Sequence, residues 1–192
     1  YLKILKINDK YINAYINLGN LKRDINKFSE SIELYEKALE IKKDNPIIYY
    51  SLALAHQGMG NFDKAIYYSK ESLKLNPKFS RADHLISQST KYKEHNEHYL
   101  SLKKKLDLFD AKSFEKVDLY FSLAKAEEDM DNISESIVYL KKGNSLKKEL
   151  LKYNVSEEFN LFKNIKENFN KLENNTSNDD KNYKIIFILG MP

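Results

Sequence analysis

Aromatic, aliphatic and small positions recur along the first half of the chain in a fixed order. Two stretches, one beginning at Tyr15 and one at Tyr49, each contain an aromatic residue, then a large aliphatic residue, then a small residue. Further small residues follow in the second half of each stretch. The equivalent pairs, all 34 positions apart, are Tyr15 and Tyr49, Leu18 and Leu52, Gly19 and Ala53, Phe28 and Phe62, Ser31 and Ala65, Ala38 and Ser72, and Leu39 and Leu73. Small residues let two helices approach closely, and aromatic residues fill the space between neighbouring pairs. The pattern therefore predicts antiparallel helix pairs that turn near residues 26–28 and 60–62.

A third unit follows in a weaker form. Ile86 lies 34 positions after Leu52, and Ser87 takes the small position, but Asp83 replaces the aromatic residue. The second helix of this unit, expected near residues 96–109, lacks the small-residue signature. The unit is therefore predicted to be a helix pair with altered packing.

A fourth unit restores the pattern and should turn near residues 131–133. Its matching positions are Tyr120, Leu123, Ala124, Ser136 and Leu140. The step from Ile86 to Leu123 is 37 residues, which predicts about three inserted residues within 107–113.

These units resemble the tetratricopeptide repeat (TPR), in which an aromatic residue, Leu-Gly, Ala, an aromatic and a final Pro recur. The residues at matching spacings are Tyr49, Leu52, Ala53, Ala65 and Pro77. The resemblance implies an all-α fold, a right-handed solenoid of helix pairs. The opening "YLKILKINDKY" is similar to the end of a repeat, so we expect the chain to begin within one.

The resemblance also implies that the first helix of each pair lines a concave surface that binds proteins. The inner positions expected to hold a partner segment, or another part of the same chain, are Asn20, Tyr50, Leu54, Tyr92 and Phe121, with Ile16, Arg23 and Glu128 beside them. The alternative is that these residues only pack against neighbouring helices.

Chaperone-binding members of the family hold a C-terminal carboxylate on this concave surface with lysine, arginine and asparagine. Asn20 fits that clamp, but Ile16 stands where its lysine is expected, so no such clamp is predicted.

The amino-acid composition bears on which other structural features and partners are expected. The 192 residues contain few helix breakers, with five glycines and three prolines, and no cysteine that could form a disulfide or a thiolate metal site. The net charge of +4 comes from intermixed charges, and the run Lys103–Lys105 lacks arginine–aromatic interleaving, so nucleic-acid binding is not expected. No apolar run reaches the roughly 18 residues that span a membrane. We expect a cytoplasmic protein.

Three candidate sites of other kinds are weak. His95 and His98 are spaced like metal ligands on a helix, but no third ligand accompanies them, and a solvated turn is expected. Asn174 begins a glycosylation sequon that fits linker composition equally well. No serine, histidine and aspartate combination indicates a catalytic triad.

The chain continues beyond the fourth unit with three different segments. Residues 156–172 predict an amphipathic helix with Ser156 as N-cap, which would close the solenoid. The predicted domains are 1–172 for the repeats and this helix, 173–182 for a polar linker, and 183–192 for the start of another domain. In that last segment Ile185 to Leu189 form a short β-branched apolar run, as in a buried parallel strand that leads into a phosphate-binding loop.

A repeat array, a closing helix, a polar linker and a strand ending in Gly-Met-Pro resemble bacterial TPR–sulfotransferase fusions. In that family the strand continues into a loop that binds 3′-phosphoadenosine 5′-phosphosulfate (PAPS). The resemblance implies that Gly190, Met191 and Pro192 form the start of this loop and that the full-length parent transfers a sulfuryl group from PAPS to an acceptor hydroxyl. The present residues would then be a non-catalytic interaction region, with no catalytic residue, metal or cofactor of their own.

Two alternatives stay open from the sequence. The first is that the array is a scaffold that binds peptide segments, either without sulfotransferase activity or fused to another transferase such as a glycosyltransferase. The second is that Ile185 to Leu189 simply dock on the last helix.

Overall fold

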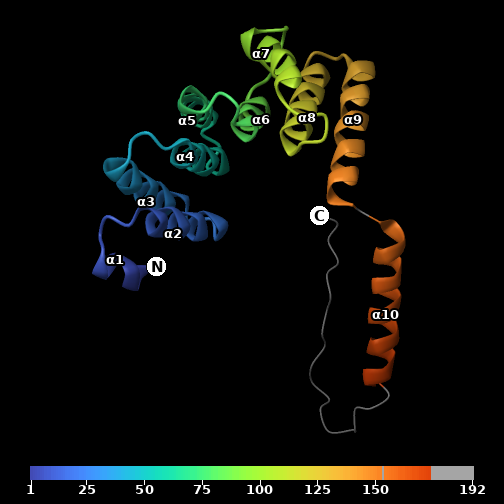
Figure 1. Cartoon of the computed structure of the whole chain (residues 1–192), viewed down its shortest axis with the longest axis horizontal. Helices are drawn as coiled ribbons and strands as arrows, with labels where there is room; N and C mark the ends of the chain where they lie inside the picture. Colours follow the sequence, from blue (N-terminus) through green and yellow to red (C-terminus); the bar gives the residue numbers. More distant parts are fainter. Residues whose placement is uncertain (153, 174–192) are drawn as a thin grey trace. The chain divides into compact units, whose positions relative to one another are not determined.

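The computed structural model describes residues 1–152 and 154–173, with side chains up to residue 169, and every regular element in these ranges is helical (Figure 1). Contacts divide the chain into two units that meet between Leu151 and Lys152. The predicted strand and the loop start at Gly190–Pro192 lie outside the described residues, as does the predicted linker apart from Glu173.

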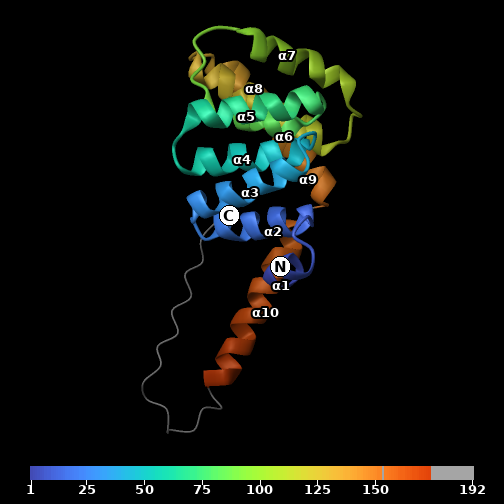
Figure 2. The same cartoon turned by 90° about the vertical axis from the view of Figure 1, so that its left-hand side faces the viewer.

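The first unit contains four helix pairs preceded by a short helix. Its elements are α1 (Leu2–Ile7), α2 (Ile12–Asp24), α3 (Phe28–Ile41), α4 (Pro46–Gly58), α5 (Phe62–Leu75), α6 (Ser80–Ser89), α7 (Glu97–Lys105), the 3-10 helix η1 (Leu106–Leu108), α8 (Phe114–Asp129) and α9 (Ile133–Leu151). Helices α2, α4, α6 and α8 follow one another along the inner side of an arc, and α3, α5, α7 and α9 form its outer side (Figure 1). Figure 2 shows α2 to α5 stacked in chain order. The first unit is therefore the predicted TPR-like solenoid.

The turns within the first, second and fourth pairs share one backbone feature. Asn26, Gly60 and Asp131 all adopt the left-handed conformation, with φ of 59°, 73° and 62°. Gly, Asn and Asp tolerate this region best, because a β-branched or bulky side chain would clash with the backbone. The three residues stand at equivalent places, between helices that end at 24, 58 and 129 and begin at 28, 62 and 133. The predicted turn positions are confirmed to within one residue.

Close approach of the two helices in a pair explains the small residues of the repeat. A Cβ atom added to Gly19 would lie 2.5 Å from the Tyr35 ring, so the ring of α3 occupies the space that a larger residue in α2 would need. In the second pair, Ala53 and Ala65 are fully buried in one cluster with Leu85. The four equivalent aliphatic residues of the repeats are all buried as predicted; they are Leu18, Leu52, Ile86 and Leu123.

The third helix pair is packed differently from the other three, as the sequence predicts. Helix α6 has only ten residues and packs between α5 and α8, while α7 packs against α8. The predicted insertion corresponds to η1 and to the loop between η1 and α8.

The second unit contributes α10 (Val155–Glu173). The predicted N-cap was wrong by two residues. Asn154 is the capping residue, because its Oδ1 accepts the Ser156 N–H at 3.0 Å and its Nδ2 donates to Glu157 at 3.1 Å. The apolar positions Phe159, Phe162 and Ile165 are at least half exposed. Closure of the solenoid by this helix stays a prediction.

A membrane-spanning segment is not found among the described helices, none of which combines sufficient length with sufficient hydropathy.

We expect Leu52→Ala to lower the free energy of unfolding by about 2–5 kcal/mol, since it would leave a cavity at a fully buried position. The matched control is Leu21→Ala on α2, where the leucine is 52% exposed and truncation should cost less than about 1 kcal/mol. Urea unfolding followed by circular dichroism measures both. Equal losses in the two variants would show that the repeat register is wrong.

Candidate partner-binding surface

Two of the predicted partner-binding residues lie together on α4, at the middle of the inner side. Tyr50 and Leu54 are half-buried and pack against the cluster formed by Ala53, Ala65 and Leu85. The Tyr50 ring also meets Phe79 edge-on, with centroids 5.0 Å apart. The buried part of each of these two side chains therefore packs against the core, while the rest of the side chain stays accessible to solvent.

Asn20 and Phe121 extend the inner side toward its two ends. Asn20 on α2 uses its Oδ1 to accept hydrogen bonds from the Tyr35 hydroxyl at 2.8 Å and from Arg23 Nη1 at 3.3 Å. Phe121 on α8 packs on Gly143 of α9, where an added Cβ would lie 2.9 Å from the ring. Both residues are half-buried.

Tyr92 does not belong to this surface, which corrects its predicted role. It lies in the loop after α6, is only 1% exposed, and bonds through its hydroxyl to Ser87 at 3.1 Å and to His98 Nδ1 at 2.6 Å. Burial raises its pKa to about 12. Its backbone N–H donates to Asp129 Oδ2 at 3.0 Å. The chain leaves the helix after Ser89, so the repeat spacing no longer places Tyr92 on an inner helix.

A row of polar side chains joins the inner helices, and the sequence patterns did not reveal it. Gln57 of α4 donates to Gln88 of α6 at 3.3 Å, Gln88 bonds to His84 Nε2 at 3.1 Å, and His84 Nδ1 bonds to Ser122 of α8 at 3.1 Å. Burial lowers the pKa of His84, so the imidazole is neutral at pH 7. The row therefore offers amide and imidazole groups rather than charge.

A buried ion pair takes the place of the missing aromatic residue in the third pair. Asp83 of α6 is fully buried, and Lys105 Nζ of α7 donates to its two oxygens at 2.8 and 2.7 Å. His98 Nε2 lies 3.4 Å from the same carboxylate. Polar contacts thus bridge α6 and α7, where the other pairs use small and aromatic residues.

The two histidines considered as metal ligands have other surroundings. His98 lies in the first turn of α7 and is largely buried, so the expected solvated turn was wrong for this residue. His95 is half exposed and stacks on Tyr99 with centroids 4.1 Å apart. No cluster of three potential metal ligands is found within the described ranges.

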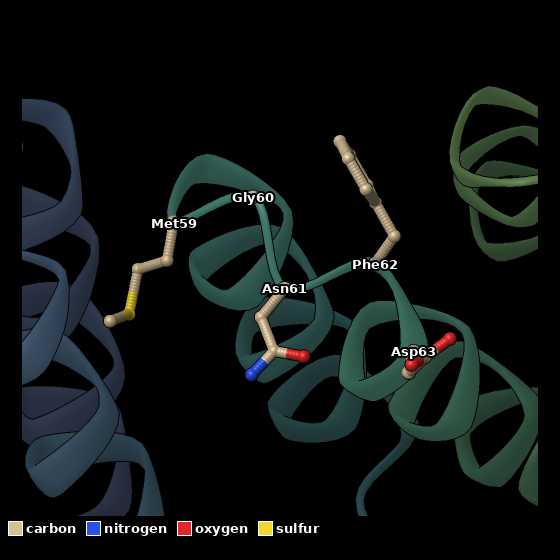
Figure 3. Close-up of a pocket in the computed structure, with 5 residues that line it drawn as sticks. All are labelled: Met59, Gly60, Asn61, Phe62 and Asp63. Atoms are coloured by element: carbon tan, nitrogen blue, oxygen red, sulfur yellow. The ribbon is translucent and has the colours of Figure 1, made fainter.

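Concave pockets lie away from the predicted residues. One, of about 410 Å³, is formed by Met59 to Asp63 at the turn between α4 and α5. In Figure 3 Met59 extends toward the preceding helix pair and Phe62 away from it. Two others, of about 540 and 670 Å³, adjoin α7. None of these three includes Asn20, Tyr50, Leu54, Tyr92 or Phe121.

Comparison with known proteins identifies the repeats. Family models described as "TPR repeat" and "Tetratricopeptide repeat" match residues 19–60 and 47–79. The small glutamine-rich tetratricopeptide repeat-containing protein 2 of Mycosarcoma maydis is 33% identical over 85 residues, which cover 42% of this chain and 24% of that protein. The photosystem I assembly protein Ycf3 of Cyanophora paradoxa is 33% identical over 86 residues, or 42% of this chain and 50% of that protein. The chain thus spans at most half of these two relatives.

Solved structures confirm the fold. MamA has a TM-score of 0.61 at 22% identity, with 80% of this chain and 88% of that chain covered. YrrB, described as a TPR protein with an unusual peptide-binding site, has a TM-score of 0.56 at 17% identity, with coverage of 76% and 74%. Residues 19–79 are tetratricopeptide repeats, and the chain contains a TPR-like helical solenoid.

We expect Asp83→Ala to destabilise the protein by about 3–5 kcal/mol, because Lys105 would be left largely buried without its partner. Replacing both groups, with Asp83→Leu and Lys105→Met, should recover most of this loss. Asp107→Ala, at an exposed position in η1, is the control and should be close to neutral. Urea unfolding of the four proteins checks this; a double variant as unstable as Asp83→Ala would contradict the ion-pair explanation.

Proposed function

We propose that this chain is a protein-interaction module that binds an extended segment of a partner along α2, α4, α6 and α8. The observation that carries the proposal is the pairing of half-buried Tyr50 and Leu54 with the polar side chains of Gln57, Gln88 and His84 on the inner helices, a row that ends at the buried Ser122 hydroxyl. Apolar side chains can contact alternate side chains of an extended segment, and amide groups can bond to its backbone.

The similarity in fold to YrrB supports this proposal, because that protein is described as having a peptide-binding site. The likeness is one of fold, so the residues that would make contact in this chain are inferred from its own surface. The occupant could be a separate protein or another domain of the same polypeptide.

A second, narrower proposal concerns the parent protein. The apolar run from Ile185 to Leu189 followed by Gly190-Met191-Pro192 favours the first strand and loop start of a PAPS-dependent sulfotransferase domain. Glycine gives the backbone freedom at the end of the strand, and proline stiffens the loop that follows. Sulfuryl transfer depends on in-line positioning and on neutralising charge at the leaving phosphate, as phosphoryl transfer does. The TPR module would then recruit the acceptor or contact the catalytic domain.

Substitutions on α4 test the module. Peptides selected from a randomised octapeptide phage library on the immobilised wild-type protein should bind Tyr50→Ala and Leu54→Asp at least about tenfold more weakly, a loss of about 1.4 kcal/mol. Tyr67→Ala is the control, because Tyr67 is exposed on the outer helix α5. Fluorescence anisotropy measures the affinities. Unchanged affinity in α4 variants that stay folded would leave these residues with a packing role only.

Donor binding tests the second proposal. A gene product that extends beyond Pro192 through the predicted domain should bind PAPS in calorimetry, and residues 1–192 alone should not. In the extended protein Gly190→Val should weaken PAPS binding by crowding the loop backbone. A sequence without a Ser-Gly-Thr-like loop after Pro192, or an extended protein that binds no PAPS, would contradict the sulfotransferase proposal and leave the scaffold in its place.

A further inference from the structure

The arginines of this chain are confined to the inner helices. Arg23 lies on α2 and Arg81 on α6, and the sequence has no other arginine. The inner helix between them is α4, which carries Tyr50. Because guanidinium groups bind carboxylates with two parallel hydrogen bonds, which an ammonium group cannot do, the position of the arginines bears on what this surface recognises.

Arg81 lies in the first turn of α6, two residues after Phe79, whose ring packs edge-on against Tyr50 with centroids 5.0 Å apart. Burial raises the pKa of Tyr50, whereas the charges of Arg81 and Arg23 act to lower it and the charge of Asp118 acts to raise it. Asp118 belongs to α8 and accepts a hydrogen bond at 2.7 Å from Ser80, the residue before Arg81, so the start of α6 lies between α4 and α8.

The two arginines differ in how far they are already engaged. Arg23 pairs with Asp24 at 3.1 Å and donates to Asn20 at 3.3 Å. Arg81, in contrast, is exposed and has no ion pair and no hydrogen bond within the part of the chain that the structure describes. The Tyr50 hydroxyl likewise has no hydrogen-bond partner among the described residues. Donors on two adjacent inner helices are thus unused, next to the apolar surfaces of Leu54 and Phe79.

We propose that Arg81 and the Tyr50 hydroxyl bind the carboxylate of an aspartate or glutamate side chain within an extended partner segment. Leu54 and Phe79 contact an apolar residue next to that acid. This inference rests on the proposed function, since it names the kind of segment that the inner helices bind.

An internal side chain fits this surface better than the end of a chain. A single unpaired guanidinium is available, because Arg23 is engaged by Asp24 and Asn20 and no lysine replaces Ile16. The inner helices continue on both sides of this position, with α2 beyond α4 and α8 beyond α6, so a segment can run past it in both directions (Figure 1). Asp118 opposes an acid here, but its charge is moderated by the hydrogen bond from Ser80 Oγ at 2.7 Å.

The test uses two randomised octapeptide libraries selected on the wild-type protein, one displayed internally and one with a free C-terminus. We expect an acidic residue beside an apolar one to be enriched in the internal library. Replacing that acid by its amide in a selected peptide should weaken binding about tenfold, a loss typical of a hydrogen bond to a charged group. Arg81→Gln should cause a similar loss, and the two changes together should cost little more than either alone, because they remove the same contact.

Three control variants separate this contact from general charge effects. Lys37→Gln removes a positive charge from the outer helix α3 and should leave the affinity unchanged. Tyr50→Phe removes only the hydroxyl and should weaken binding of the acidic peptide but not that of its amide form. Asp118→Asn should strengthen binding of the acidic peptide about two- to fivefold by removing a nearby like charge.

The outcomes distinguish this inference from the function on which it rests. Peptides that bind equally well with acid or amide, additive losses for Arg81→Gln and the amide peptide, or acid enrichment only at a free C-terminus would each overturn it while the module still binds peptides. Failure to select any peptide that is sensitive to Leu54→Asp would overturn the proposed function as well.

Discussion

The close approach of the two helices within a pair is the constraint on which the rest of this structure depends. Where Gly19 meets the Tyr35 ring, and where Ala53 and Ala65 are buried together, no larger residue could be accommodated without moving one helix away from the other. The short distance between the two helices of each pair lets the next pair stack closely against it. Stacking in turn brings α4, α6 and α8 near enough for side chains of adjacent inner helices to bond with each other.

The third pair shows what happens when that constraint is relaxed. Asp83 cannot fill the space of an aromatic ring, and the pair is instead bridged by Lys105 and His98. Two hydrogen bonds keep the inner surface continuous across this irregular pair: Ser80 of α6 donates to Asp118 of α8, and His84 bonds to Ser122. The inner side of α6 therefore follows α8 closely, although the outer side of the third pair is irregular.

The fold was largely predictable because its determinants are local or strictly periodic. The turn positions follow from the spacing, and the residues that adopt positive φ there, Asn26, Gly60 and Asp131, are of types that tolerate it. Tyr92 was misplaced because the spacing ceases to apply once the chain leaves the helix at Ser89. The partnership of Asp83 with Lys105 depends on how an irregular loop returns the chain to α6, and no local pattern encodes that path.

The candidate surface could be predicted only in part for a related reason. Tyr50 and Leu54 stand beside Tyr49 and Leu52, whose register fixes the inner side of the helix, and so they could be assigned to that side. The row from Gln57 through His84 to Ser122, in contrast, joins residues of three different pairs. Such a row exists only when neighbouring pairs stack in the correct geometry, and in a solenoid each pair is positioned by its neighbours alone. Buried residues between the pairs, such as Leu85 beneath Tyr50 and Leu54, therefore determine the spacing of the groups that a partner would contact. In this chain the core and the proposed partner-binding surface are two sides of the same inner helices, so a change in packing would also change the geometry of that surface.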